Sequence, residues 1–304
     1  MHTVGWDRPW LRYLWISVGY AVVFELLGFV FISHWQLTAG FRVACLLLVP
    51  RRYWLALIAG EALADSAFVY GCVGRLGLPW GLSVLFVPMM LNMISVGLFR
   101  KYRPIIDANK RVVVSSLLLC IFASVIMSTG AEVIEFALMQ GLSPEKRFSA
   151  AHVDSYSYLW FLGTGLGIYA IVPFALWAYT EDDLNWQSPL SGIVSSPLLL
   201  TAVAFLVPSL YVLAHTIVYT HAESLRHIAQ VAMLLTPAWF AWRYGWQGAS
   251  LACMMANLAV VQSMPALYDH TTLQTQTWMM VSSTVWILLG ARFSTARFPQ
   301  TPAQ

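Results

Sequence analysis

The chain has 304 residues, of which 59% are hydrophobic and only 10% are charged. Soluble domains carry about 25% charged residues, so this composition excludes an ordinary water-soluble domain. The net charge of +3 is small and no basic stripe is present, which argues against a nucleic-acid partner. Apolar runs of about 18 or more residues recur along the chain and predict a polytopic helical membrane protein in contact with the lipid bilayer.

Hydropathy predicts an all-α membrane bundle of about ten transmembrane helices. Several segments are shorter than the roughly 20 residues that a perpendicular span needs, so the pattern allows roughly eight to ten spans. We expect residues 1–11 to form an N-terminal extension, residues 12–293 the membrane domain and residues 294–304 a short tail. The predicted segments are 11–32, 37–49, 53–72, 79–99, 112–138, 156–179, 197–219, 228–242, 246–264 and 277–293.

The positions of the basic residues predict an orientation. With both chain ends in the cytoplasm, the inside loops contain twelve basic residues, the outside loops contain four, and Arg42 lies inside a helix. This bias favours cytoplasmic ends, because basic residues gather on the cytoplasmic side. The twelve are Arg8, Arg12, Arg51, Arg52, Arg100, Lys101, Arg103, Lys110, Arg111, Arg243, Arg292 and Arg297, and the four are Arg75, Lys146, Arg147 and Arg226.

No pattern of catalytic or metal-binding residues stands out. The four cysteines are far apart and form no Cys-x-x-Cys pair, which gives neither a zinc site nor a redox motif. Apart from His221 and His227, which flank a loop, the histidines form no pair at metal spacing with acidic help. We therefore expect no metal, no cofactor and no enzymatic activity.

Arg42 and Glu61 are charges inside two neighbouring apolar segments. Arg42 lies eight residues before Pro50, about 12 Å from the cytoplasmic end of its helix. Glu61 lies nine residues after Arg52, about 14 Å deep on the next helix. The tight turn between the segments makes these helices antiparallel neighbours. We therefore predict that Arg42 and Glu61 pair, and that this ion pair has a structural role.

Asp65 and Glu25 have no predicted partner. Asp65 is one turn beyond Glu61 on the same helix face, because residues four apart stack. Glu25 lies thirteen residues after Arg12, about 20 Å deep, which is close to the depth of Asp65. The four groups can form a ligand-binding or proton-linked pocket, since charges inside a membrane are functional candidates. The alternative is an ion pair that fixes helix packing, with the remaining acids protonated.

Glu132 and Glu135 lie in the later part of the segment 112–138. They are candidates for the rim of an outward-facing pocket, together with His152 and Asp154. The alternative is a solvated helix end, where a charge needs no special role.

Gly163 and Gly167 form a small-residue face on the segment 156–179. Such a face admits a closely packed neighbouring helix. A dinucleotide-binding loop is disfavoured, because no strand precedes these glycines and their spacing is wrong.

The ordered motifs of this chain resemble the first type of membrane-associated sensor (MASE) domain over residues 12 to 292. The matching residues are Trp35 with Gly40, then Pro50-Arg51-Arg52-Tyr53-Trp54 and Gly60; Gly165-Leu166-Gly167-Ile168 with Pro173 and Trp177; and Pro237 with Trp242-Arg243-Tyr244-Gly245 and Gly248-Ala249.

The resemblance implies an integral-membrane input module of the bacterial inner membrane. Members are usually followed by a histidine kinase or a diguanylate cyclase, but this sequence contains neither a kinase His box nor a Gly-Gly-Asp-Glu-Phe motif. A separate signalling protein of one of these kinds is therefore the expected partner. The rival hypothesis is a proton-coupled transporter or permease, because intramembrane acids and proline-broken helices suit proton-coupled transport.

Overall fold

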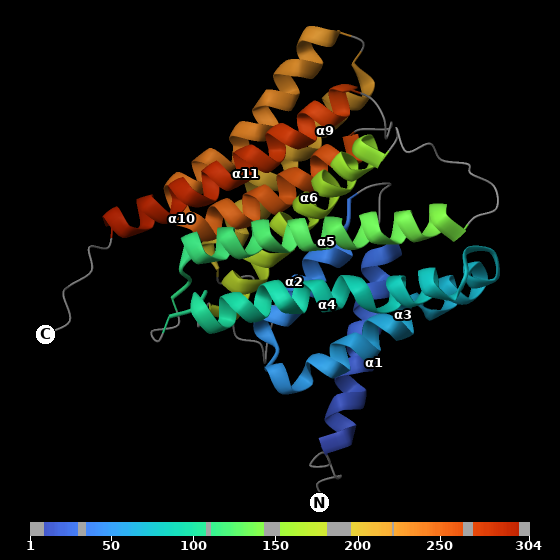
Figure 1. The fold of residues 1–304 in the computed structure, drawn as a ribbon. Coiled ribbons are helices and arrows are strands. Elements are labelled where there is room, and N and C mark those ends of the chain that lie inside the picture. Colours follow the sequence, from blue (N-terminus) through green and yellow to red (C-terminus); the bar gives the residue numbers. More distant parts are fainter. Residues whose placement is uncertain are drawn as a thin grey trace, which may run out of the picture.

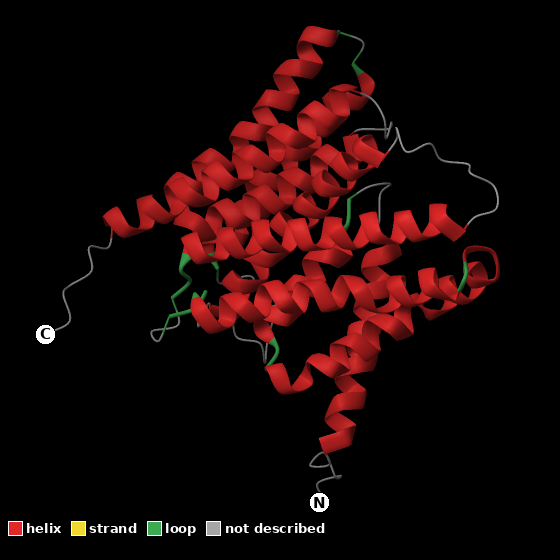
Figure 2. Ribbon diagram, in the orientation of Figure 1, coloured by secondary structure: helices red, strands yellow, loops and turns green. Residues whose placement is uncertain are grey.

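The computed structural model describes residues 9–29, 35–107, 111–142, 153–180, 196–220, 222–263 and 270–297. Within these ranges all the regular elements are helices, and the β-structure is limited to one antiparallel bridge between Ile106 and Val112 (Figure 2). The predicted all-α fold class is confirmed.

The helices follow the predicted apolar segments closely along the chain (Figure 1). A 3₁₀ turn, Arg51–Tyr53, joins α2 to α3, and a π-helical segment, Ala202–Leu206, joins α8 to α9. The α-helices are α1 (Pro9–Phe29), α2 (Leu37–Leu48), α3 (Trp54–Leu76), α4 (Leu78–Tyr102), α5 (Val114–Leu142), α6 (Val153–Thr180), α8 (Pro197–Thr201), α9 (Val207–Tyr219), α10 (Glu223–Ser263) and α11 (His270–Arg297).

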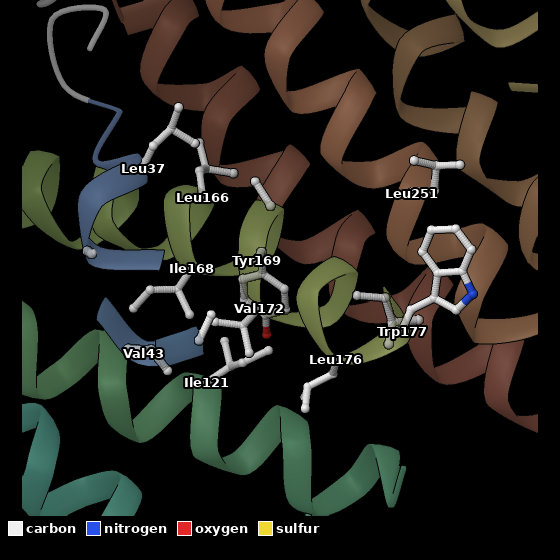
Figure 3. Packing of buried hydrophobic residues seen from close by; sticks show 14 of the residues in the cluster. Leu37, Val43, Ile121, Leu166, Ile168, Tyr169, Val172, Leu176, Trp177 and Leu251 are labelled. Carbon is white, nitrogen blue, oxygen red and sulfur yellow. The ribbon is translucent and has the colours of Figure 1, made fainter. Parts of the chain in front are cut away.

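Helix α6 lies at the centre of the bundle and packs against α2, α5, α10 and α11 (Figure 1). Its side chains are apolar on several faces, so neighbouring helices can surround it. Figure 3 shows this core: Leu166, Ile168 and Val172 of α6 lie among residues of α2, α5 and α10. The central position of α6 joins the N-terminal helices to α10 and α11.

Large apolar side chains cover the outside of the bundle. Phe29 and Tyr70 are each 86% exposed, and Phe205 is 69% exposed. In water such surfaces would be costly, whereas lipid tails solvate them at no cost. The exposed surface therefore agrees with a multi-pass membrane protein.

The prediction of ten spans is wrong. Among the described residues, six helices are long and apolar enough to cross a bilayer, namely 10–29, 51–76, 78–102, 114–141, 156–180 and 197–219. Helix α2 has only 12 residues and is about 18 Å long, which is shorter than the bilayer core. Helices α10 and α11 are rich in Gln, Asn, Ser and Thr, which lowers their hydropathy. The cytoplasmic location of the chain ends stays a prediction.

The 41 residues of α10 are divided by a break at Gly245, whose φ of 70° lies in the left-handed region. A Cβ atom on Gly248 would lie 2.5 Å from the carbonyl oxygen of Phe240. Eight residues of straight helix would separate these positions by about 12 Å, so the chain folds back at Gly245. The boundary predicted between the segments 228–242 and 246–264 falls at this break.

Candidate functional site

The α2–α3 hairpin is fixed at its turn by arginines of two helices. Arg100 of α4 donates from Nη1 to the carbonyl oxygens of Leu46 and Val49, at 2.9 and 2.8 Å. These are carbonyls at the end of α2, which otherwise lack helical partners. Arg51 donates from Nη2 to the carbonyl oxygen of Gly97 at 2.9 Å. The two arginines therefore anchor the hairpin to α4.

Arg42 and Glu61 form a buried ion pair across this hairpin. Nη2 of Arg42 lies 2.8 Å from Oε1 of Glu61, and Nε lies 2.9 and 3.0 Å from Oε1 and Oε2. Arg42 is 7% exposed and Glu61 is fully buried. The structure thus brings together the two residues that the depth estimate paired. Two donors on one carboxylate give the strong, oriented geometry of a charge-assisted pair.

Helix α1 joins the ion pair through Tyr20, which the sequence did not indicate. Its hydroxyl donates to Oε2 of Glu61 at 2.7 Å. Helices α1 and α3 approach closely because Gly60 of α3 has no side chain. A Cβ atom on Gly60 would lie 2.6 Å from the carbonyl oxygen of Ser17 in α1. Ser17 also donates to the carbonyl oxygen of Ala56 at 2.9 Å. Glu61 therefore connects α1, α2 and α3.

Asp65 and Glu25 lie beside the ion pair without joining it by hydrogen bonds among the described residues. Asp65 is half-buried and interacts electrostatically with Glu61, Arg42 and Glu25. Glu25 is exposed on the outer face of α1. Of the four candidate residues, the structure buries Arg42 and Glu61, places Asp65 at their edge and leaves Glu25 at the surface.

Glu132 and Glu135 face the interior and not a solvated rim. Oε1 of Glu132 accepts a long hydrogen bond of 3.4 Å from the Thr164 hydroxyl, and Gln36 also hydrogen-bonds this carboxylate. Oε2 of Glu132 and Oε1 of Glu135 are buried with no hydrogen-bond partner among the described residues. Both acids interact electrostatically with Arg42. His152 and the side chain of Asp154, predicted to share a rim with them, lie outside the description.

This inward position has a geometric cause. Glu132 lies ten residues before the end of α5 at Leu142, about 15 Å from that end. The acids are therefore within the helix and not in its last turn. They lie near the charge cluster around Arg42, on a fourth helix.

The close packing of α2 on α6 brings Gln36 and Thr164 into the cluster. The backbone N–H of Gln36 donates to the carbonyl oxygen of Gly163 at 3.2 Å. A Cβ atom on Gly167 would clash with the backbone of Gln36, and one on Gly40 would clash with Gly167. The predicted small-residue packing face is confirmed. It also lets the Thr164 hydroxyl donate to Oε1 of Gln36 at 2.9 Å.

The cluster therefore contains one cation and four acids on the described parts of α2, α3 and α5, which are Arg42, Glu61, Asp65, Glu132 and Glu135. Tyr20, Gln36 and Thr164 complete it and were missed by the sequence analysis. A signal was present for two of them: Gln36 lies in the matched stretch between Trp35 and Gly40, and Thr164 lies between Gly163 and Gly165.

Comparison with known proteins identifies the family. No curated protein and no solved structure matches the chain at a significant level. The MASE1 family matches residues 11–297, which is nearly the whole chain and leaves no room for an output domain within these 304 residues. The chain therefore belongs to the MASE1 family of membrane sensor domains.

Proposed function

We propose that this protein is a sensory input module of the bacterial inner membrane that passes its signal to a separate signalling protein. The partner is a histidine kinase, a diguanylate cyclase or another signalling protein that reads the packing of the helices. Membership of the MASE1 family supports the sensory role.

The observation that carries the proposal is the convergence of α1, α2, α3 and α5 on one buried ion pair. Arg42 and Glu61 are bonded to each other, Glu61 also accepts from Tyr20, and the acids of α5 interact with Arg42. A stimulus can change the packing only if it favours one arrangement over another. A charge cluster suits this task, because adding or removing one charge in an apolar interior has a large energetic effect.

The test is to delete the gene in its native host and to measure the phosphorylation of co-purifying kinases and the level of cyclic di-GMP. We expect at least one signalling protein to co-purify in mild detergent and its output to change on deletion. If nothing co-purifies and no output changes, the proposal is wrong.

Complementation separates signalling from stability. Asp65→Asn removes a charge at the edge of the cluster. We expect the deletion strain that expresses this variant to contain the protein at its normal level but not to recover the normal signalling output. Ser66→Ala is the matched control, because Ser66 is the next residue of α3 and is exposed. It should restore the output fully. Equal outputs from the two variants would argue against the cluster as the sensing element.

A proton-coupled transporter is the second candidate, favoured by the unpartnered oxygens of Glu132 and Glu135 inside α5. Intramembrane acids that lack partners are typical of proton relays. Proton flux in proteoliposomes that Asp65→Asn abolishes would support this candidate. Intact proteoliposomes that show no proton flux under a pH gradient would exclude the transporter.

A further inference from the structure

The acids of α5 have buried oxygen atoms for which the described residues supply neither a hydrogen-bond donor nor a counter-charge. The Thr164 hydroxyl, which donates to Gln36 at 2.9 Å, lies 3.4 Å from Oε1 of Glu132, and Oε2 of Glu132 has no partner within the described ranges. Oε1 of Glu135 is likewise buried and unpartnered there. A buried carboxylate oxygen without a donor or counter-charge is strongly disfavoured. Something small that provides both must therefore accompany these atoms.

Arg42 carries a single positive charge and is already bonded to Glu61, so it does not neutralise the acids of α5 as well. Both Nε and Nη2 of Arg42 bond to Glu61, at 2.8 to 3.0 Å. The Tyr20 hydroxyl donates to the same carboxylate. Arg42 and Glu61 neutralise each other, and three acids are left over: Asp65, Glu132 and Glu135.

The other described groups that pack around α5 and the hairpin supply no further cation to these acids. Arg100 of α4 is bonded to the carbonyls at the end of α2, and the described side chains of α6 carry no charge. The titratable or charged groups that interact with the cluster are Tyr20 and Glu25 from α1, Arg42 and Cys45 from α2, and Glu61 and Asp65 from α3.

The geometry disfavours a metal ion as the missing charge. Within the described ranges, no three His, Cys, Asp or Glu side chains are grouped closely enough to hold one. A proton needs no such grouping and no cavity. It neutralises one carboxylate and supplies the hydrogen-bond donor that the unpartnered oxygen lacks.

We propose that Glu132, Glu135 and Asp65 bind exchangeable protons, and that their occupancy sets how α5 packs on its neighbours α4 and α6 beside the charge cluster. Each binding event converts a carboxylate and a hydronium ion into a carboxylic acid and water. Loss of the protons leaves like charges in an apolar interior, and their repulsion loosens the packing of α5. The consequence for signalling rests on the proposed sensory function, whereas proton binding itself does not.

Infrared difference spectroscopy on the purified protein in lipid nanodiscs tests proton binding without any partner. Spectra are compared between about pH 5 and about pH 9. Exposed carboxyl groups are ionised through nearly all of this range. We expect a protonated-carboxyl band to persist near neutral pH and to disappear at higher pH. Absence of this band at neutral pH would overturn the proposal.

Isosteric variants assign the band. Glu132→Gln and Glu135→Gln should each remove part of it, and the double variant most of it. Glu223→Gln is the control, because Glu223 is exposed at the start of α10. It should leave the band unchanged. Should the double variant fail to fold, as judged by size-exclusion chromatography, the single variants and the wild-type titration decide the question.

A second arm separates protons from metal cations. At constant pH, choline is replaced by sodium at equal ionic strength. We expect no change in the carboxyl band, and its loss on addition of sodium would assign the site to a metal cation and overturn the proposal. A titrating band in a protein without a signalling partner would sustain the proton site and overturn the proposed sensory function. A partner without a titrating band would do the opposite.

Discussion

The α2–α3 hairpin and the α10–α11 pair are both consecutive helices in an apolar surrounding, but different interactions connect them: a side-chain ion pair in the first and close helix packing in the second. The hairpin buries Arg42 and Glu61, which are the charged side chains that the described part of the chain buries fully. The α10–α11 pair buries uncharged groups, among them Asn257 and Ser283, each 1% exposed. It also approaches through glycines, since a Cβ atom on Gly290 would lie 2.7 Å from the carbonyl oxygen of Gly245.

The difference teaches which region can respond to a stimulus. Close contact between small residues depends on shape, which a change of pH or of charged ligand leaves unaltered. A buried ion pair depends on charge balance, and the loss of one partner leaves the other charge without compensation. We therefore propose that the charge cluster senses the stimulus and that the α10–α11 pair has a structural role.

The largest predicted effect is on the hairpin. Glu61→Ala leaves Arg42 buried without its partner and should lower the free energy of unfolding by about 3–5 kcal/mol. Thermal unfolding in detergent micelles measures this. Replacing both residues, as Arg42→Met with Glu61→Met, should recover most of the loss, because an apolar pair needs no compensation. If the double variant is as unstable as the single one, the charge is not the cause and the comparison fails.

The next effect is on packing by shape, where α2 crosses α6. Gly167→Ala would place a Cβ atom against the backbone of Gln36, which cannot move aside as a side chain can. We expect a loss of about 1–3 kcal/mol in the free energy of unfolding. Gly130→Ala in α5 is the matched control, because nothing lies within 4 Å of its added Cβ atom. It should be stabilising by up to about 1 kcal/mol, and equal losses in the two variants would contradict the assigned contact.

The hairpin was predictable because its geometry is local. The turn at Pro50-Arg51-Arg52 fixes both helix ends, and the constant rise of a helix then gives the depths of Arg42 and Glu61. The inward position of Glu132 and Glu135 was not predictable in this way. Helix α5 is apolar on all sides, so its hydropathy does not reveal which face turns inward. Tertiary packing alone decides it.

The span count was wrong for a different reason. An apolar run can mark a helix that is too short or too polar to count as a candidate span, as α2 and α10 illustrate. Helix α2 is apolar but short, and its 12 residues lie against α6 within the bundle. The break at Gly245 was located correctly, but the polar content of α10 and α11 lowers their hydropathy below that of a typical span.

A smaller effect is expected within the α10–α11 pair. Neither the amide nitrogen nor the oxygen of Asn257 has a hydrogen-bond partner among the described residues. Asn257→Leu removes the cost of two buried unsatisfied groups and should raise the free energy of unfolding by about 1–3 kcal/mol in the best case. Ser250→Ala is the control, since its hydroxyl is bonded to the Trp246 carbonyl at 2.8 Å. A loss of stability in Asn257→Leu would show that the amide binds something in the native membrane.

The smallest predicted effect tests an intermediate case, the α4–α5 interface. Asn92 donates to the Ser128 hydroxyl at 2.7 Å and to the carbonyl oxygen of Pro88 at 2.8 Å, so its amide nitrogen is satisfied without any charge. A double-mutant cycle with Asn92→Ala and Ser128→Ala should give a coupling of about 0.6 kcal/mol, as for other hydrogen bonds between membrane helices. Thermal unfolding of the wild type, the two single variants and the double variant, all without urea, measures this coupling. A coupling as large as that of the Arg42–Glu61 pair would mean that uncharged contacts hold α5 as strongly as charges do. In that case a change in the protonation of Glu132 and Glu135 would be too weak to displace α5, and the assignment of sensing to the charge cluster would have to be abandoned.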